Sequence, residues 1–327
     1  MNRRDTIRAL LMLGVAAVPL RAWTQERMRR IGYLIMSPLA EKPSPERVAF
    51  IDGLRKLGYV EGRNLSIEYR SAEMEAEFLP ALASELVKSG VELIFAVENT
   101  VVSAAVKAAP DLPVVFVSIM DPVEMGFARS LARPGKNATG ITLLGVNLSP
   151  KRLELLRNLL PRARRIAVLR GGAGASSGGE WAAIKPAAAK LGFELELFSV
   201  GDAAEFPRQF KRIARAKPDA LFVLTDSRTI AARRIIADFA FEHGLPSAMG
   251  FSGYPNAGGL ISLAANFTEH FGRAATYVDK ILKGAAPGDL PIEQPTTFDL
   301  LINLKTARAL RLSIPQAVLL RADKVIE

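Results

Sequence analysis

An order of helices and strands that occurs twice constrains this chain more than any other feature. In each half, a helix ending in Lys-Leu-Gly and an aromatic residue leads into a strand. Two further segments match in the same order and at nearly constant spacing. The matched pairs are 55–59 with 189–193, 91–96 with 218–223, and 111–113 with 244–246. This repetition predicts two similar lobes; the alternative is one large doubly wound sheet with accidental similarity.

Short apolar runs alternate with helical stretches in the first half of the chain. Strands are expected at 31–35, 65–69, 93–97 and 114–117, and helices at 45–57, 79–88 and 101–109. Short runs rich in β-branched and aromatic residues are typical of buried strands. Strands connected through helices form parallel sheets covered on both faces. The predicted fold class is therefore α/β, with a parallel sheet flanked by helices in each lobe.

The stretch 113–144 combines three roles in one segment. A buried strand at 114–117 is followed by polar residues, at the end of the strand where open α/β sheets bind ligands. Turn residues then lead into a second strand at 141–144. We therefore expect this stretch to form one wall of a ligand cleft and a hinge between the lobes.

The last part of the chain, after the two repeated halves, contains a third group of predicted strands and helices. It predicts a strand at 258–263, a helix at 267–283, and a second strand and helix at 298–303 and 304–312. These pieces fit a chain that crosses back to lobe one and returns, which makes three crossovers. Lobe one is predicted to comprise 28–145 plus 265–293, and lobe two 146–264 plus 294–327. Short crossovers of this kind support hinge closing.

The amino terminus has the pattern of an export signal. Arg3 and Arg4 precede an apolar run at 9–20, which is short for a membrane span and is interrupted by Pro19. Residues 1–24 are predicted to be a cleavable signal peptide that directs the chain to the periplasm. The two arginines resemble a twin-arginine (Tat) signal, and an ordinary Sec signal with a basic start is the alternative. The sequence contains no Cys, which excludes a lipoprotein anchor.

Composition excludes several functional classes. The absence of Cys and the presence of only two His argue against thiol catalysis, disulfides and most transition-metal sites. The net charge of +10 is spread over amphipathic stretches, without a basic block or groove-binding motif, so no nucleic-acid partner is expected. We expect no catalytic residue, no metal and no cofactor, because nucleotide-binding and nucleophile-elbow motifs are absent as well.

Candidate ligand contacts follow the predicted strands, at the edge where both sheets should face the cleft. Free N–H groups at the helix starts there suit a carboxylate, two aspartates suit an ammonium group, and two aromatic rings could flank an apolar moiety. The candidates in lobe one are Ser37, Asn99, Thr100, Ser118 and Asp121. Those in lobe two are Asp226, Ser227, Phe251 and Tyr254.

Each candidate has a structural alternative. Asn99, Ser118 and Asp226 can serve as helix caps only, and Asp121 before a proline can serve in a turn. The two aromatic residues can belong to the core. The glycine-rich segment 171–179 lacks the residues of a phosphate-binding P-loop, which leaves a flexible loop or an anion cradle.

Several longer motifs are spread over nearly the whole chain. They include F-x-x-G-L-R-x-L-G-Y-V-E-G-R-N at 50–64, S-L-A-R-P-G-x-N-x-T-G at 130–140, K-R-L-E-L-L at 151–156 and Y-V-D-K-I-L-K-G at 277–284. Further motifs are L-P-A-L-A-x-E-L-V at 79–87, D-P-V at 121–123, L-P-x-E-Q-P-T at 290–296, I-N-L-K-T-A at 302–307 and L-L-R-A-D-K-V-I-E at 319–327. Together they resemble the motifs of a large bacterial family, the ABC-transporter substrate-binding proteins. Relatives usually carry an Asn-Pro-rich loop where this chain has the glycine-rich segment.

The resemblance implies a two-lobed, three-crossover (type I) periplasmic binding protein that closes on a solute and hands it to an inner-membrane ABC permease. Some relatives are described as binding tryptophan or tyrosine. The expected ligand is an amino acid or aromatic carboxylate, and the expected state is a monomer. The alternatives are a periplasmic sensory binding protein for a receptor and a two-domain α/β enzyme.

Overall fold

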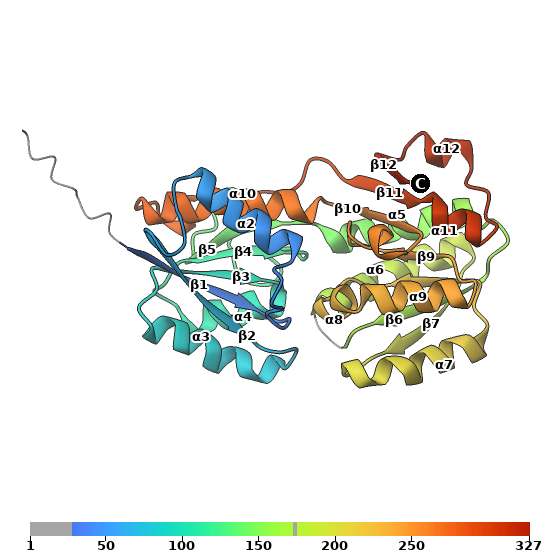
Figure 1. Cartoon of the computed structure of the whole chain (residues 1–327), viewed down its shortest axis with the longest axis horizontal. Helices are drawn as coiled ribbons and strands as arrows, with labels where there is room; N and C mark the ends of the chain where they lie inside the picture. The colour runs from blue at the N-terminus through green and yellow to red at the C-terminus, as the bar shows by residue number, and fades with distance from the viewer. Residues whose placement is uncertain (1–27, 173–174) are drawn as a thin grey trace, which may run out of the picture.

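The computed structural model describes residues 28–172 and 175–327. The signal peptide predicted at 1–24 lies outside these residues. They form two α/β lobes that lie side by side, with the connecting segments along one edge (Figure 1). Within the described part of the chain, no helix combines the length and the apolar character that crossing a membrane requires.

Lobe one is built on a five-stranded parallel sheet in the order β2-β1-β3-β4-β5. The strands are β1 (Arg29–Ile35), β2 (Leu65–Ser71), β3 (Leu93–Val97), β4 (Val114–Ser118) and β5 (Ala138–Thr142). Its helices are α2 (Pro45–Lys56), α3 (Leu79–Lys88), α4 (Asn99–Ala108) and α10 (Phe267–Leu282), with short 3₁₀ turns η1 (Ala76–Phe78) and η4 (Pro287–Asp289). The central strands are apolar at consecutive positions because both faces of the sheet are covered.

The two faces of this sheet support separate clusters of apolar side chains. One cluster joins Phe95 and Val117 to Phe50 of α2 and to α10. The other joins Phe116 to the apolar sides of α3 and α4. Figure 1 shows the orange α10 lying on the blue-green lobe, although it comes late in the sequence. The chain therefore returns to lobe one after building most of lobe two.

Lobe two contains a seven-stranded sheet in the order β12-β11-β10-β9-β8-β6-β7. The strands are β6 (Arg165–Arg170), β7 (Glu194–Ser199), β8 (Ala220–Val223), β9 (Ser247–Met249), β10 (Ile261–Ala264), β11 (Asp299–Asn303) and β12 (Lys324–Ile326). Its helices are α5 (Gly145–Leu159), α6 (Ala175–Leu191), α7 (Phe206–Ala216), α8 (Ser227–Ala231), α9 (Arg233–Glu242), α11 (Leu304–Ala309) and α12 (Gln316–Leu319), with 3₁₀ turns η2 (Ala203–Glu205) and η3 (Pro255–Ala257).

Three chain segments connect the lobes, between β5 and α5, between β10 and α10, and before β11. At the first, Leu144 has a left-handed backbone with φ 52°. At the third, Glu293 still pairs with Ile141 of lobe one, whereas Asp299 already pairs with Ala264 of lobe two. The predicted fold class, two similar α/β lobes joined by three crossovers, is confirmed. The exact lobe boundaries stay a prediction.

Several details differ from the sequence-based expectations. β11 runs antiparallel to β10, and β12 adds a further strand at the sheet edge. Helix α4 begins at Asn99 rather than at 101. Helix α6 begins at Ala175, so Gly178 and Gly179 belong to a helix rather than to a loop. A Cβ added at Gly179 would lie 3.4 Å from Val146 of α5, which shows that the two helices pack closely there.

Candidate ligand-binding site

A cavity of about 490 Å³ lies between the lobes. Its walls come from the carboxyl-end loops of strands in both sheets, which is where open parallel sheets bind their ligands. Lobe one contributes Met36, Met74, Ala76, Glu98, Thr100, Ser103 and Met125. Lobe two contributes Gly171, Gly172, Asp226, Ser227 and Arg228. The volume is within the range that small-molecule sites occupy in proteins.

Two hydrogen bonds join the lobes across this cavity. The Ser227 hydroxyl of α8 donates to Oε2 of Glu98, and Nη2 of Arg228 donates to the Met74 carbonyl at 3.3 Å. The Arg228 guanidinium also donates to the carbonyls of Gly171 and Val200, at 3.1 and 3.3 Å. The lobes are therefore in contact at the cavity, which stays partly open to solvent.

Asp226 lies at the start of α8 with its carboxylate already engaged. Oδ1 accepts the Thr229 N–H at 3.0 Å, completing a capping box, and Oδ2 accepts the Gly171 N–H at 2.9 Å. Burial raises the pKa of Asp226, while these N–H groups act to lower it. A Cβ at position 171 would overlap Oδ1 of Asp226 and lie 2.7 Å from Cβ of Arg228. Glycine at 171 is thus what allows the backbone to approach the carboxylate.

Glu98 supplies a second carboxyl group to the cavity, from the opposite lobe. It precedes α4 with φ 81° and ψ 148°, a conformation that is essentially restricted to glycine. Its Oε1 accepts the Thr100 hydroxyl at 3.5 Å, and its Oε2 accepts that of Ser227. Desolvation between the lobes raises the pKa of Glu98 to about 7, and the nearby Asp226 adds to this increase.

Methionines form the apolar part of the cavity wall. Met36 follows β1, Met74 follows β2, and Met125 lies in the loop after β4. The carbonyl of Met36 accepts the N–H of Met74 at 2.8 Å, which holds two of these residues together. Methionine is flexible and polarisable and makes favourable sulfur contacts with aromatic rings. This wall suits an aromatic or a long apolar moiety.

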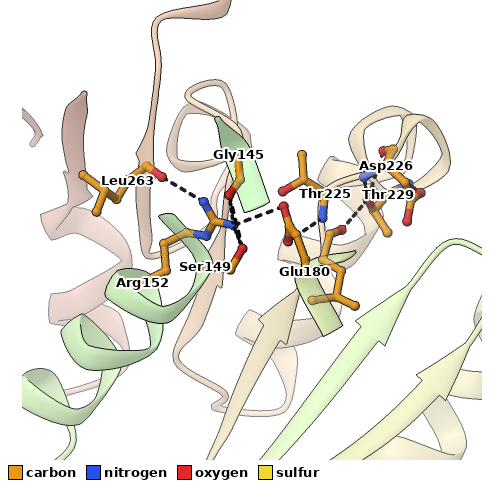
Figure 2. Close-up of polar contacts among 9 residues, drawn as sticks. Gly145, Ser149, Arg152, Glu180, Thr225, Asp226, Thr229 and Leu263 are labelled. Atoms are coloured by element: carbon orange, nitrogen blue, oxygen red, sulfur yellow. Dashed lines mark hydrogen bonds and ion pairs between the residues drawn. The ribbon is translucent and has the colours of Figure 1, made fainter. Parts of the chain in front are cut away.

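A buried ion pair supports the loop that carries Asp226 (Figure 2). Arg152 of α5 and Glu180 of α6 are 1% and 0% exposed, with Nη2 and Oε1 3.1 Å apart. This is an ion contact rather than an aligned hydrogen bond, because Oε1 has no hydrogen-bond donor. Oε2 of Glu180 accepts the N–H of Thr225, the residue before Asp226, at 3.1 Å. The pair therefore links α5 and α6 to the binding loop.

The Arg152 guanidinium also contacts both ends of the crossover region. Its Nη2 donates to the Ser149 hydroxyl at 2.6 Å and to the Gly145 carbonyl at 3.3 Å, just after the first crossover. Its Nη1 donates to the Leu263 carbonyl at 3.2 Å, just before the second. Figure 2 shows the guanidinium lying between these groups and Glu180. Crossovers and binding loop are thus joined through one buried cation.

Three of the residues predicted from the sequence line the cavity: Thr100, Asp226 and Ser227. The other lobe-one candidates make local contacts. The Ser37 carbonyl accepts the Ser71 hydroxyl at 2.9 Å. Ser118 donates to the Met120 carbonyl at 3.3 Å and borders a small adjoining cavity that Glu98 and Asp226 also line.

Asn99 and Asp121 hold backbone groups instead of facing the main cavity. Oδ1 of Asn99 accepts the Ile119 N–H at 3.2 Å, while its buried Nδ2 has no hydrogen-bond partner. Oδ1 of Asp121 accepts the Val123 N–H at 2.7 Å, which is the turn contact that an Asp before a proline favours.

The two aromatic candidates belong to the core, the alternative that the sequence left open. Tyr254 is 0% exposed and donates to the Ser247 hydroxyl at 2.9 Å. Phe251 is 4% exposed and packs edge-on against Phe267, with ring centroids 5.1 Å apart. Sequence reasoning did not select Glu98, Arg228 or the methionines as ligand contacts, although Met36 and Glu98 lie in loops that it placed at the cleft. A charged residue directly after a buried strand was the available signal for Glu98.

Comparison with known proteins agrees with this architecture. The family model for ABC transporter substrate binding proteins matches residues 41–326. A curated relative named tyrosine-binding protein, from Clostridioides difficile, is 27% identical over 288 residues, which are 87% of this chain and 81% of the relative. The fold and the cleft define a two-lobed solute-binding protein of the type I class. The chain belongs to the ABC transporter substrate-binding protein family.

Two solved structures have similar sequence identity to this chain but different TM-scores against it. An ABC domain in complex with L-Trp from Streptococcus pneumonia is 25% identical, with TM-score 0.81 over 91% of this chain and 100% of the other. A ligand-free, open substrate binding protein from Clostridium difficile is 26% identical, with TM-score 0.62 over 91% and 99%. The whole described structure therefore superposes better on the tryptophan complex than on the open protein.

Proposed function

We propose that this chain is the periplasmic solute-binding component of an ABC importer and that it closes on an aromatic amino acid without altering it. The observation that carries this proposal is the cavity between the lobes, with carboxyl groups from both lobes and a methionine wall. A carboxylate pair suits the ammonium group of an amino acid, and the methionines suit its ring. The named tyrosine-binding relative and the tryptophan complex support the same ligand class.

Within this proposal, the amino-acid carboxylate is held at the start of α4. The first N–H groups of a helix have no partner within the helix and carry partial positive charge. Thr100 and Ser103, on the first turns of α4, add hydroxyl groups at the cavity wall. Export by a cleavable signal at 1–24, delivery to an inner-membrane permease, and a monomeric state complete the proposal.

Binding and closure test it directly. Calorimetry should detect L-tyrosine or L-tryptophan, and small-angle scattering should show a smaller radius of gyration with that ligand than without it. The ligand should be recovered chemically unchanged after incubation. Turnover of the bound amino acid would contradict the binding-protein function. Absence of binding by any aromatic amino acid would contradict the proposed ligand class.

A further inference from the structure

Glu98 is held in a backbone conformation that a glycine would adopt without strain. Its N–H donates to the Val117 carbonyl at 3.0 Å, and its carbonyl accepts the Val102 N–H at 2.9 Å. These bonds fix the backbone between β3 and α4 whatever side chain is present. Strained positions of this kind cluster at ligand clamps, where the side chain is needed. The reason for glutamate at 98 must therefore lie in what its carboxyl group contacts.

The surroundings of the carboxyl group include few charges. From α8 it is faced by Asp226 and Arg228, and from its own helix by the Thr100 hydroxyl. The small cavity of about 70 Å³ beside it is lined mainly by apolar residues, including Val117 of β4 and Phe267 and Phe271 of α10, and also by Ser118, Asp226 and Ser227. The Arg228 guanidinium already donates to three backbone carbonyls. The charges nearest to Glu98 are thus the carboxylate of Asp226 and the guanidinium of Arg228, which is hydrogen-bonded to backbone carbonyls and not to Glu98.

Two carboxyl groups in one partly dehydrated cleft are not both ionised at low cost. Asp226 receives two backbone N–H groups, which stabilise its ionised form. Glu98 receives only the hydroxyl groups of Thr100 and Ser227. Consistent with this difference, burial raises the pKa of Glu98 to about 7. In the closed protein without ligand, Glu98 is therefore the group of the two that keeps a proton.

We propose that Glu98 makes the cleft selective for ligands with a positively charged nitrogen, which displaces the proton of Glu98 as it binds between Glu98 and Asp226. This inference rests on the proposed function and adds a specificity-determining residue to it. Because the two carboxyl groups come from different lobes, a cation held by both favours the closed arrangement. A ligand of the same shape without the charge leaves the proton in place and gains nothing from Glu98.

The pH dependence follows from this exchange. Below about pH 7 the ligand cation competes with a proton on Glu98, so affinity should rise with pH and level off above 7. Without ligand, the stability of the fold should change with pH in the opposite direction to affinity. Because the pKa of Glu98 is raised in the folded protein, its contribution to stability is fully present below its unfolded pKa near 4.5 and is lost as pH rises through 7.

The test compares L-tyrosine and L-tryptophan with their des-amino analogues, 3-(4-hydroxyphenyl)propionate and indole-3-propionate, in the full chain. Calorimetry of the wild type at pH 6, in two buffers of different ionisation enthalpy, should show proton release with the amino acids only. Glu98→Gln should reduce the preference for the amine at least tenfold and remove the proton release. Glu98→Gly, which keeps the backbone conformation without the carboxyl group, should lose the same preference while remaining at least as heat-stable.

Two results would overturn the proposal. One is wild-type binding of an amino acid and its analogue with equal affinity, which leaves the proposed binding function intact. The other comes from the unliganded protein and needs no ligand. The difference in melting temperature, Glu98→Gln minus wild type, should increase between pH 4.5 and pH 8. A difference that does not change with pH would show that Glu98 holds no proton in this range. Failure of the wild type to bind any of the four compounds would instead contradict the proposed ligand class.

Discussion

Replacing Glu180 by Gln should destabilise lobe two strongly, because Arg152 would keep its charge in a buried site. Arg152 is 1% exposed, and its other partners, the Ser149 hydroxyl and the carbonyls of Gly145 and Leu263, are neutral. Gln can still accept the Thr225 N–H, but its amide would bring N–H groups toward Nη2 of Arg152. Breaking a buried pair by removing one partner costs about 3–5 kcal/mol. We expect Glu180→Gln to lose an amount of this size.

The converse change, Arg152→Met, should depend on pH. Glu180 can respond to the loss of its partner by taking up a proton, whereas an arginine keeps its charge at any accessible pH. Burial already raises the pKa of Glu180 with Arg152 present, and Arg152 acts to lower it. Without Arg152 the folded pKa is higher still, so the loss of stability should be smallest in acid and grow as pH rises. The double variant Arg152→Met, Glu180→Gln should lose about 2–3 kcal/mol less than the sum of the singles.

Urea denaturation followed by tryptophan fluorescence measures these differences. The chain has two tryptophans, and with Trp23 changed to Phe only Trp181 remains, next to Glu180 and packed against the core of lobe two. Arg208→Met is the matched control, because Arg208 pairs with Glu205 on the surface and is 67% exposed. That change should cost at most about 1 kcal/mol. Strictly additive costs for Arg152→Met and Glu180→Gln would refute the reasoning.

Three further outcomes are expected at the cleft. Asp226→Asn should lower affinity for the amino acid about ten- to hundredfold, since a charge-assisted hydrogen bond contributes roughly 1.5–3 kcal/mol. The same change should lower the melting temperature of the unliganded protein, because the single amide oxygen of Asn cannot accept both the Thr229 and the Gly171 N–H group in the present geometry. Gly171→Ala should weaken binding at least tenfold by displacing Asp226, whereas Gly178→Ala, with nothing within 4 Å of the added methyl group, should bind normally in calorimetry. Ser227→Ala should weaken ligand affinity by removing a contact between the lobes, and unchanged affinity would show that closure does not use this bond.

The arrangement of the lobes was predictable because its signals are local. Apolar runs such as 114–117, bounded by proline and polar residues, mark buried strands, and glycines mark helix ends. The position of the cleft follows from the parallel sheets alone. Strand direction at β10 and β11 was not predictable in this way, because pairing between segments so far apart in the chain is decided by tertiary packing.

The candidate site was predictable only in part, because facing a cavity and facing the core produce similar sequence patterns. Tyr254 and Asp226 both follow strands of lobe two, yet the ring lies in the core and the carboxylate at the cavity. Asn is a usual helix-cap residue and Glu is not, so the sequence favours Asn99 over the neighbouring Glu98 at the start of this helix. The position of Glu98 after a buried strand is only a weak signal in the sequence, and its positive φ, which depends on the contacts around it, is visible only in the structure.

The cross-lobe contacts indicate what a ligand must contribute to closing. Among the described residues, the hydrogen bonds of Ser227 with Glu98 and of Arg228 with Met74 span the cavity. Net contributions of hydrogen bonds of this kind are about 0.5–1.5 kcal/mol each, and closing also brings Glu98 near Asp226, which opposes it when both are ionised. These two hydrogen bonds therefore favour closure without ligand only weakly, and the opposition between the two carboxyl groups is smallest in acid, where Glu98 is neutral. A ligand cation between Glu98 and Asp226 replaces their mutual repulsion by attraction to the cation. Near neutral pH, the two carboxyl groups that oppose closure without ligand would therefore hold the lobes together around the bound cation.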